Sequence, residues 1–214
     1  RRNGEIIQGR LTCGCGLTVP VRGAVPRFVG GAGYTSSFSF EWKRHPTTQL
    51  DSQNRFTRSE RSFQQRIDLP LASLQRQLVL DAGCGTGRYA EVAAKYGATV
   101  IGVDMSEAID VASHNLMNRE QVHLVQADLS RLPFAPATFD LVFSFGVLHH
   151  TTNCEQVFRA IARLVKPGGR LIVTVYSAYN KGIVYTSAFW RAITTRLPKW
   201  LLYGLCAVSI PLYY

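Results

Sequence analysis

A glycine-rich loop between an apolar run and a helix-forming run restricts the folds open to this chain more than any other feature. Residues 77–81 (QLVLD) form a short apolar run that ends at an acid, and residues 89–96 (YAEVAAKY) favour a helix that stops at the next glycine. Between them stand Gly83, Gly85 and Gly87. Glycine lets a chain turn tightly and lets its backbone approach a ligand without an intervening Cβ. A glycine loop that follows a strand and opens a helix favours ligand binding over a purely structural turn.

Strand and helix patterns alternate beyond this loop. Helix-forming stretches at about 106–118 and 153–165 separate further apolar runs at 99–104, 122–127, 139–145 and 170–176. Near-continuous apolar runs are typical of parallel strands that are buried on both faces. The sequence therefore predicts an α/β fold: a doubly wound, Rossmann-like parallel sheet with five recognisable strands. We expect the final strands of a complete sheet to be missing and the C-terminal segment to be helical.

Carboxylates stand at the ends of three of these strands, at Asp81, Asp104 and Asp128. The carboxyl ends of parallel strands share one edge of a sheet, where ligands bind, so this edge is a candidate ligand rim. Asp104 lies 19 positions after Gly85, where an acid is placed to accept hydrogen bonds from the ribose of a nucleoside. A P-loop is excluded because no Gly-Lys-Ser/Thr follows. A dinucleotide loop needs glycine at its sixth position, where Arg88 stands.

Five segments, in this order, resemble class I S-adenosylmethionine-dependent methyltransferases. They are DAGCGTG at 81–87, GVDMS at 102–106, QADL at 126–129, FDLVF at 139–143 with LHH at 148–150, and LVKPGGRL at 164–171. The resemblance covers about residues 77–176 and is closest to the branch that includes ubiquinone and menaquinone biosynthesis methyltransferases. It implies methyl transfer with S-adenosyl-L-methionine as cofactor, with Asp104 at the ribose and Asp128 at the adenine amino group. The cofactor-binding residues that it implies are Asp81, Gly83, Cys84, Gly85, Gly87, Asp104, Met105, Asp128, Leu129 and Phe145.

The candidate catalytic residues are His149 and His150, which follow the fourth strand at the same rim. Histidine titrates near neutral pH and suits a general base for a hydroxyl or an acidic carbon. The alternative is that one or both only pack or hydrogen-bond at the turn, and an amine or thiolate acceptor needs no base. Tyr176 is a weaker candidate. We expect Cys84 to be a small packed residue, because nothing beside it would depress its pKa.

The flanking segments divide the chain into four parts. Residues 1–33 resemble part of a small zinc ribbon, but Cys13 and Cys15 are separated by one residue and no upstream pair precedes them, so we expect no bound metal. Residues 34–76 are expected to be a helical connector or lid, with Arg44, Thr48 and Gln49 as residues that reach over the cofactor. Residues 77–176 form the expected methyltransferase core. Residues 177–214 form a helical apolar and basic segment with breaks expected near Pro198 and Pro211.

Charge and cysteine content bear on partners and compartment. The net charge is +7 over residues 1–76, −1 over residues 77–176 and +4 over residues 177–214, where no acid occurs. The aromatic and basic residues of 185–214 suit a lid over an apolar acceptor, or peripheral contact with an anionic membrane. No basic-aromatic ladder and no Asn-Pro-Pro-Tyr motif is present, which disfavours nucleic acid. The five cysteines, an odd number and scattered apart from Cys13 and Cys15, and the polar start of the sequence predict a cytoplasmic protein.

Two rival classes share parts of this pattern. An NAD-dependent oxidoreductase would have the same fold and the same use for Asp104, but lacks the sixth-position glycine. A non-catalytic cofactor-binding module with basic flanks would bind the cofactor without turnover. The acceptor, the methylated atom and the oligomeric state are not encoded in any motif of the sequence.

Overall fold

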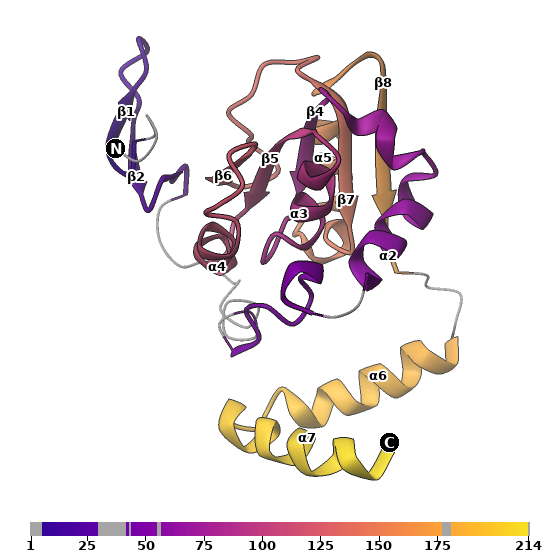
Figure 1. Cartoon of the computed structure of the whole chain (residues 1–214). Coiled ribbons are helices and arrows are strands. Elements are labelled where there is room, and N and C mark those ends of the chain that lie inside the picture. The colour runs from indigo at the N-terminus through magenta and orange to yellow at the C-terminus, as the bar shows by residue number, and fades with distance from the viewer. Residues whose placement is uncertain (1–5, 30–41, 43, 55–56, 177–180, 214) are drawn as a thin grey trace. The chain divides into compact units, whose positions relative to one another are not determined.

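The structure, a computed structural model, describes residues 6–29, 42, 44–54, 57–176 and 181–213 of the 214-residue chain. The chain divides into two compact units, residues 1–175 and residues 176–214, and each is described by itself. The first unit holds a five-stranded sheet, its helices and a small N-terminal ribbon (Figure 1).

The central sheet is parallel throughout, in the order β6-β5-β4-β7-β8. Its strands are β4 (Leu78–Ala82), β5 (Thr99–Asp104), β6 (Val122–Gln126), β7 (Phe139–Phe145) and β8 (Val165–Thr174). The chain moves outward from β4 to β6 and then returns to the other side of β4, so the strand order reverses between β4 and β7. This is the crevice in which doubly wound sheets bind ligands. The predicted fold class is confirmed.

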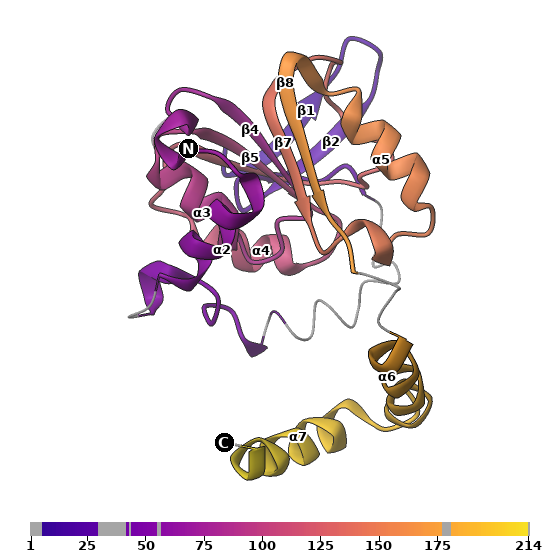
Figure 2. The ribbon, with the colours of Figure 1, turned by 90° about the vertical axis from the view of Figure 1, so that its right-hand side faces the viewer.

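Helices cover both faces of the sheet. In Figure 2, α5 lies on the opposite side of the sheet from α3 and α4. The helices of this unit are α2 (Arg58–Ile67), α3 (Arg88–Lys95), α4 (Ala108–Asn115) and α5 (Cys154–Ala162), with short 3-10 turns η1 (Asp51–Gln53), η2 (Leu71–Leu74) and η3 (Leu148–His150). Asn153 caps α5: its Oδ1 accepts a hydrogen bond from the Gln156 N–H at 2.9 Å.

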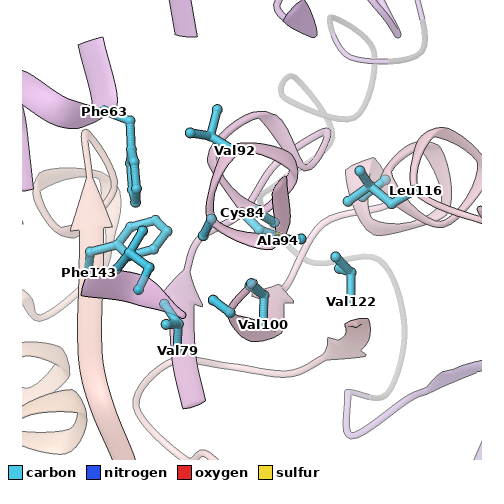
Figure 3. Close-up of a cluster of buried hydrophobic side chains, with 14 of the residues drawn as sticks. Phe63, Val79, Cys84, Val92, Ala94, Val100, Leu116, Val122 and Phe143 are labelled. Carbon is cyan, nitrogen blue, oxygen red and sulfur yellow. The ribbon is translucent and has the colours of Figure 1, made fainter. Parts of the chain in front are cut away.

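The core consists of two clusters, one on each face of the sheet. Adjacent strand residues point to opposite faces, so Val79 joins the first cluster and Leu80 the second. The first cluster, part of which is shown in Figure 3, includes Phe63 of α2 and Phe143 of β7. Apolar burial on both faces explains why these strands have continuous apolar sequences rather than alternating ones.

The N-terminal segment is a three-stranded antiparallel ribbon. It consists of β1 (Gln8–Thr12), β2 (Thr18–Arg22) and β3 (Val25–Pro26), in that order. Alternate residues Val19 and Val21 are buried, which gives the ribbon one apolar face. This antiparallel ribbon is what the structure describes of residues 1–33, and the resemblance of this segment to part of a zinc ribbon stays a prediction.

The second unit contains two helices, α6 (Lys181–Thr194) and α7 (Lys199–Tyr213). The chain breaks before Lys199 as expected from Pro198, but α7 continues through Pro211 and ends two residues later. Neither of these helices, nor any other in the described parts of the chain, combines the length and apolarity needed to span a membrane.

One predicted boundary is wrong. The fifth apolar run was predicted at residues 170–176, whereas β8 begins at Val165, includes Lys166–Gly169 and ends at Thr174. The pairing of β7 with β8 shifts register between Phe139 and Leu141, and Gly168 has a φ of 79°. A local irregularity therefore accommodates Pro167 and the two glycines inside the strand.

Candidate cofactor site

The glycine loop joins β4 to α3 in a conformation that only glycine adopts without strain. Gly83, Gly85 and Gly87 have φ values of 93°, 54° and 89°. A Cβ on Gly83 would lie 2.4 Å from a methyl group of Val147, and one on Gly87 would lie 2.4 Å from Leu116. At Gly85, by contrast, the nearest atoms belong to the Trp42 ring, 3.9 Å away. The outer glycines therefore serve close packing, and the middle one leaves open space beside the loop.

Asp104, at the end of β5, is bound to this loop. Its Oδ2 accepts a hydrogen bond from the Gly85 N–H at 3.0 Å, and its Oδ1 accepts from the N–H and hydroxyl of Ser106 at 2.8 and 2.7 Å. A carboxylate offers about four lone-pair sites, so Asp104 keeps capacity for further donors such as ribose hydroxyls.

Asp128 follows the neighbouring strand β6 on the same side of the sheet. Its Oδ1 accepts a hydrogen bond from the Ser130 N–H at 2.8 Å, which fixes the turn after the strand. Asp104 and Asp128 both line one cavity of about 250 Å³. The sheet thus brings together two of the three acids that the sequence placed at strand ends.

Asp81, the third acid, lies behind the loop rather than in the cavity wall. It is 3% exposed, and its Oδ2 has no hydrogen-bond partner among the described residues. Burial, reinforced by the negative charge of Asp104, raises the pKa of Asp81 to about 8. A buried carboxyl group with one oxygen that lacks a partner is suited to a cationic ligand, which would restore the ionised form of the group.

Eight of the ten cofactor residues expected from the sequence line the cavity. They are Gly83, Cys84, Gly85, Asp104, Met105, Asp128, Leu129 and Phe145. Asp81 and Gly87 are not in the cavity wall: Gly87 packs against Leu116 instead.

Cys84 lies between the cavity and the core: it lines the cavity, and its side chain belongs to the first core cluster (Figure 3). Burial, followed by the charges of Asp81 and Asp104, raises the pKa of its thiol well above the usual value. The thiol is therefore protonated at neutral pH, as expected for a packed residue.

The two histidines have different surroundings. His150 lines the cavity, whereas His149 does not, and the centroids of their rings lie 4.1 Å apart. Burial, followed by the nearby His150, lowers the pKa of His149, so its imidazole is neutral at pH 7.

Several residues of the cavity wall were not identified from the sequence. One of them is Trp42 of the connector. Of the three lid residues that were expected in the connector, Gln49 lines the cavity, whereas Arg44 and Thr48 do not. Arg88 and Tyr89, from the start of α3, also line it. Arg88 donates a hydrogen bond to the Ser59 hydroxyl at 2.9 Å and lies over the Tyr89 ring, 4.8 Å from its centroid. Arg88 was recognised in the sequence only as a departure from the dinucleotide pattern.

The residues of this site fit S-adenosylmethionine. The cofactor carries a nucleoside, a sulfonium and an ammonium group. The open side of Gly85 provides space for close approach, Asp104 and Asp128 provide acceptors for a nucleoside, and Asp81 adds a buried acid that favours cations. A dinucleotide fits less well, because Arg88 occupies the position where such a loop needs glycine to pack its helix against the strand.

Fold and site together define a class I S-adenosylmethionine-dependent methyltransferase domain. Residues 80–173 match the family model described as a methyltransferase domain. This part of the chain, from β4 into β8, therefore matches a methyltransferase domain, and the match indicates S-adenosyl-L-methionine as the cofactor. The resemblance inferred from the sequence motifs is confirmed.

Known proteins support the same class. The chain is 33% identical over 129 residues to a ubiquinone biosynthesis O-methyltransferase of Coxiella burnetii, a match that covers 59% of this chain and 55% of that protein. The chain thus spans about half the length of the curated relatives it matches.

Among solved structures, the fold is similar to the PH0226 protein of Pyrococcus horikoshii OT3. The TM-score is 0.54 with 27% identity, covering 71% of this chain and 69% of that one. An S-adenosylmethionine-dependent methyltransferase of Mesorhizobium loti is 28% identical with a TM-score of 0.45, covering 50% of each chain.

Proposed function

We propose that the protein transfers the methyl group of S-adenosylmethionine to a small, largely apolar acceptor. The observation that carries this proposal is that Asp104 and Asp128, from two strands, line the same cavity as the glycine loop. Trp42, Tyr89 and Phe145 in the same wall supply the apolar surface that favours an apolar acceptor.

When bound, S-adenosylmethionine supplies a methyl group that is already activated by its positive sulfur. The protein has to align the acceptor in line with the sulfur–carbon bond, exclude water and remove the acceptor proton. The aromatic wall serves the first two tasks. For a hydroxyl acceptor, His150 is the residue to take the proton, because it is the histidine that lines the cavity. The His149 ring lies against it at an interplanar angle of 51° and, as a neutral ring, adds no second charge.

The Coxiella burnetii relative is named as an O-methyltransferase of ubiquinone biosynthesis. This name supports a hydroxyl oxygen as the methylated atom and an apolar ring compound as the acceptor. Both are proposals for the present chain.

The test is release of S-adenosylhomocysteine in the presence of phenolic acceptors with and without apolar side chains. Turnover with the apolar phenols, and a large loss in His150→Ala with a smaller loss in His149→Ala, would support the proposal. Tight cofactor binding without turnover on any acceptor, together with salt-sensitive retention on RNA, would favour a non-catalytic binding module instead.

We also propose that the connector, residues 34–76, acts as a lid, supported by Trp42 and Gln49 in the cavity wall.

The free cysteines of the described parts, which include Cys13 and Cys15 on the ribbon, support a reducing, cytoplasmic setting and give no indication of a metal site.

For residues 185–214 we propose peripheral contact with an anionic membrane surface. Tyr185, Trp190 and Trp200 are 71%, 61% and 74% exposed, and residues 177–214 carry four basic residues and no acid. Exposed aromatic rings beside basic residues are typical of helices that lie in a membrane interface.

Vesicle flotation tests this contact. The protein should float with vesicles that contain phosphatidylserine and not with neutral vesicles, and Trp190→Ser with Trp200→Ser should abolish flotation. If the unaltered chain ignores anionic vesicles, the membrane contact is wrong, and a role as a cover for an apolar acceptor remains for this segment.

A further inference from the structure

The residues that follow β3 of the N-terminal ribbon pair with the edge strand of the central sheet. Arg27 forms a parallel bridge with Gln126 of the edge strand β6, and the Phe28 N–H donates a hydrogen bond to the Gln126 carbonyl at 2.7 Å. The Phe28 side chain packs against the second core cluster. Residues 27 and 28 are thereby held in register with β6, the strand that precedes Asp128.

The Arg27 guanidinium, 11% exposed, binds three acceptors. One nitrogen bonds to Asp110 Oδ1 at 2.5 Å and to the Arg22 carbonyl at 3.2 Å. The other donates to Gln126 Oε1 at 3.0 Å. A planar guanidinium presents its donors in a fixed fork, so these acceptors determine its orientation together.

The amide nitrogen of Gln126 contacts the cofactor site, while the amide oxygen contacts Arg27. Its Nε2 donates a hydrogen bond to the Met105 carbonyl at 3.0 Å. An amide has one acceptor end and one donor end, and Arg27 can only donate. Arg27 therefore holds the amide oxygen toward itself and the amide nitrogen toward Met105.

Met105 and Ser106 form the turn after β5, and both line the cavity. The N–H and hydroxyl of Ser106 bind Asp104 Oδ1, and Asp104 Oδ2 binds the Gly85 N–H. A continuous series of hydrogen bonds thus runs from Arg27 through Gln126 and this turn to Asp104 and the glycine loop.

We propose that Arg27 is a positioning residue for cofactor binding, acting through Gln126 on the Met105–Ser106 turn. The N-terminal ribbon is then part of the methyltransferase site, although none of its residues lines the cavity. This inference rests on the proposed function, because it assigns the Asp104 side of the cavity to the nucleoside of the cofactor.

A double-mutant cycle on S-adenosylhomocysteine affinity, measured by calorimetry, separates positioning from simple docking of the ribbon. Arg27→Ala and Gln126→Ala should each weaken binding roughly three- to tenfold, the effect of one lost hydrogen bond. The double variant should bind no more weakly than the weaker single variant, because Arg27 acts through Gln126. Gln126→Glu keeps an acceptor for Arg27 but removes the donor to Met105, so it should lose as much as Gln126→Ala.

Arg22→Ala is the matched control. It removes a basic side chain from the same ribbon, and it keeps the main-chain carbonyl through which Arg22 accepts a hydrogen bond from Arg27. Its affinity should stay within twofold of the unaltered chain. Hydrogen exchange of the cofactor-free protein gives a second readout. The amides of residues 105–108 should exchange faster in Arg27→Ala and Gln126→Ala, and their exchange rates should be unchanged in Arg22→Ala.

If Arg27→Ala binds S-adenosylhomocysteine as tightly as the unaltered chain, or if the two losses multiply in the double variant, the positioning role is overturned. If the unaltered chain does not bind S-adenosylhomocysteine at all, the proposed function itself fails. Thermal unfolding of each variant verifies that it is folded under the conditions of the binding measurement.

Discussion

The Asp104 carboxylate accepts a hydrogen bond from the Gly85 main-chain N–H at 3.0 Å, across the gap between β5 and the loop that follows β4. This bond ties the acid expected at the ribose to the middle glycine, the one whose open side faces the cavity. Cofactor recognition and loop conformation are therefore linked through one side chain.

Replacing Asp104 tests this link. Asp104→Ala removes the acceptors of the Gly85 and Ser106 donors as well as those for the ribose, so S-adenosylhomocysteine binding should weaken by ~1–3 kcal/mol. Asp104→Asn keeps one acceptor oxygen and should lose less. Calorimetry that finds the same affinity in the alanine variant and the unaltered chain would remove Asp104 from the site.

Asp128 permits a similar comparison on the adenine side. Asp128→Asn leaves an oxygen that can accept from an amino group, so its loss of affinity should be smaller than that of Asp128→Ala. Equal losses in the two variants, measured by calorimetry, would argue against an acceptor contact.

The buried Asp81 should make stability depend on pH. Its pKa is about 8 in the folded protein and near 4 in the unfolded chain, so between these values the folded state holds the additional proton. Stability contributed by this group therefore falls as pH rises, by about 1.4 kcal/mol per unit between pH 5 and pH 7. Asp81→Asn should lack this dependence. Urea unfolding of both proteins at several pH values measures the difference, and parallel pH profiles would contradict a raised pKa.

The same group should release a proton when a cation binds nearby. A cationic cofactor favours the ionised form of Asp81, so binding of S-adenosylmethionine at pH 7 should release protons in the unaltered chain and fewer in Asp81→Asn. Calorimetry in buffers of different ionisation enthalpy counts these protons. Equal release from the two proteins would place the cofactor's positive charges away from Asp81.

The glycines of the loop should differ in what they tolerate. Gly83→Ala brings a Cβ within 2.4 Å of Val147 at a φ of 93°, and we expect it to destabilise the fold by about 2–4 kcal/mol. Gly85→Ala meets nothing closer than 3.9 Å, so it should cost about 1 kcal/mol of stability and yet weaken cofactor binding. Urea unfolding and calorimetry on both variants separate the two effects. A Gly85→Ala protein with unaltered affinity would show that the cofactor does not approach this residue.

The sheet was predictable because each strand has its own local signal. Continuous apolar runs ending in acids identified β4, β5 and β6. For β5 and β7, the predicted first and last residues are also those of the structure. The start of β8 was missed because Lys166–Gly169 has the composition of a turn, and its place in the strand depends on pairing with β7.

Long-range contacts account for the parts of the site that were missed. Nothing near Trp42 in the sequence indicates that it will lie beside Gly85, and the series from Arg27 to Met105 joins residues far apart in the chain. His149 and His150 are adjacent and chemically identical, so only the geometry of the η3 turn decides that His150 lines the cavity.

The central claim is that the glycine loop and its acid rim form a site for S-adenosylmethionine, and equilibrium calorimetry of the unaltered chain tests it most directly. Titration with S-adenosylhomocysteine should give saturable binding at one site per chain, and titration with NAD should give no heat of binding. Saturable binding of NAD without binding of S-adenosylhomocysteine would contradict the account and favour the oxidoreductase alternative.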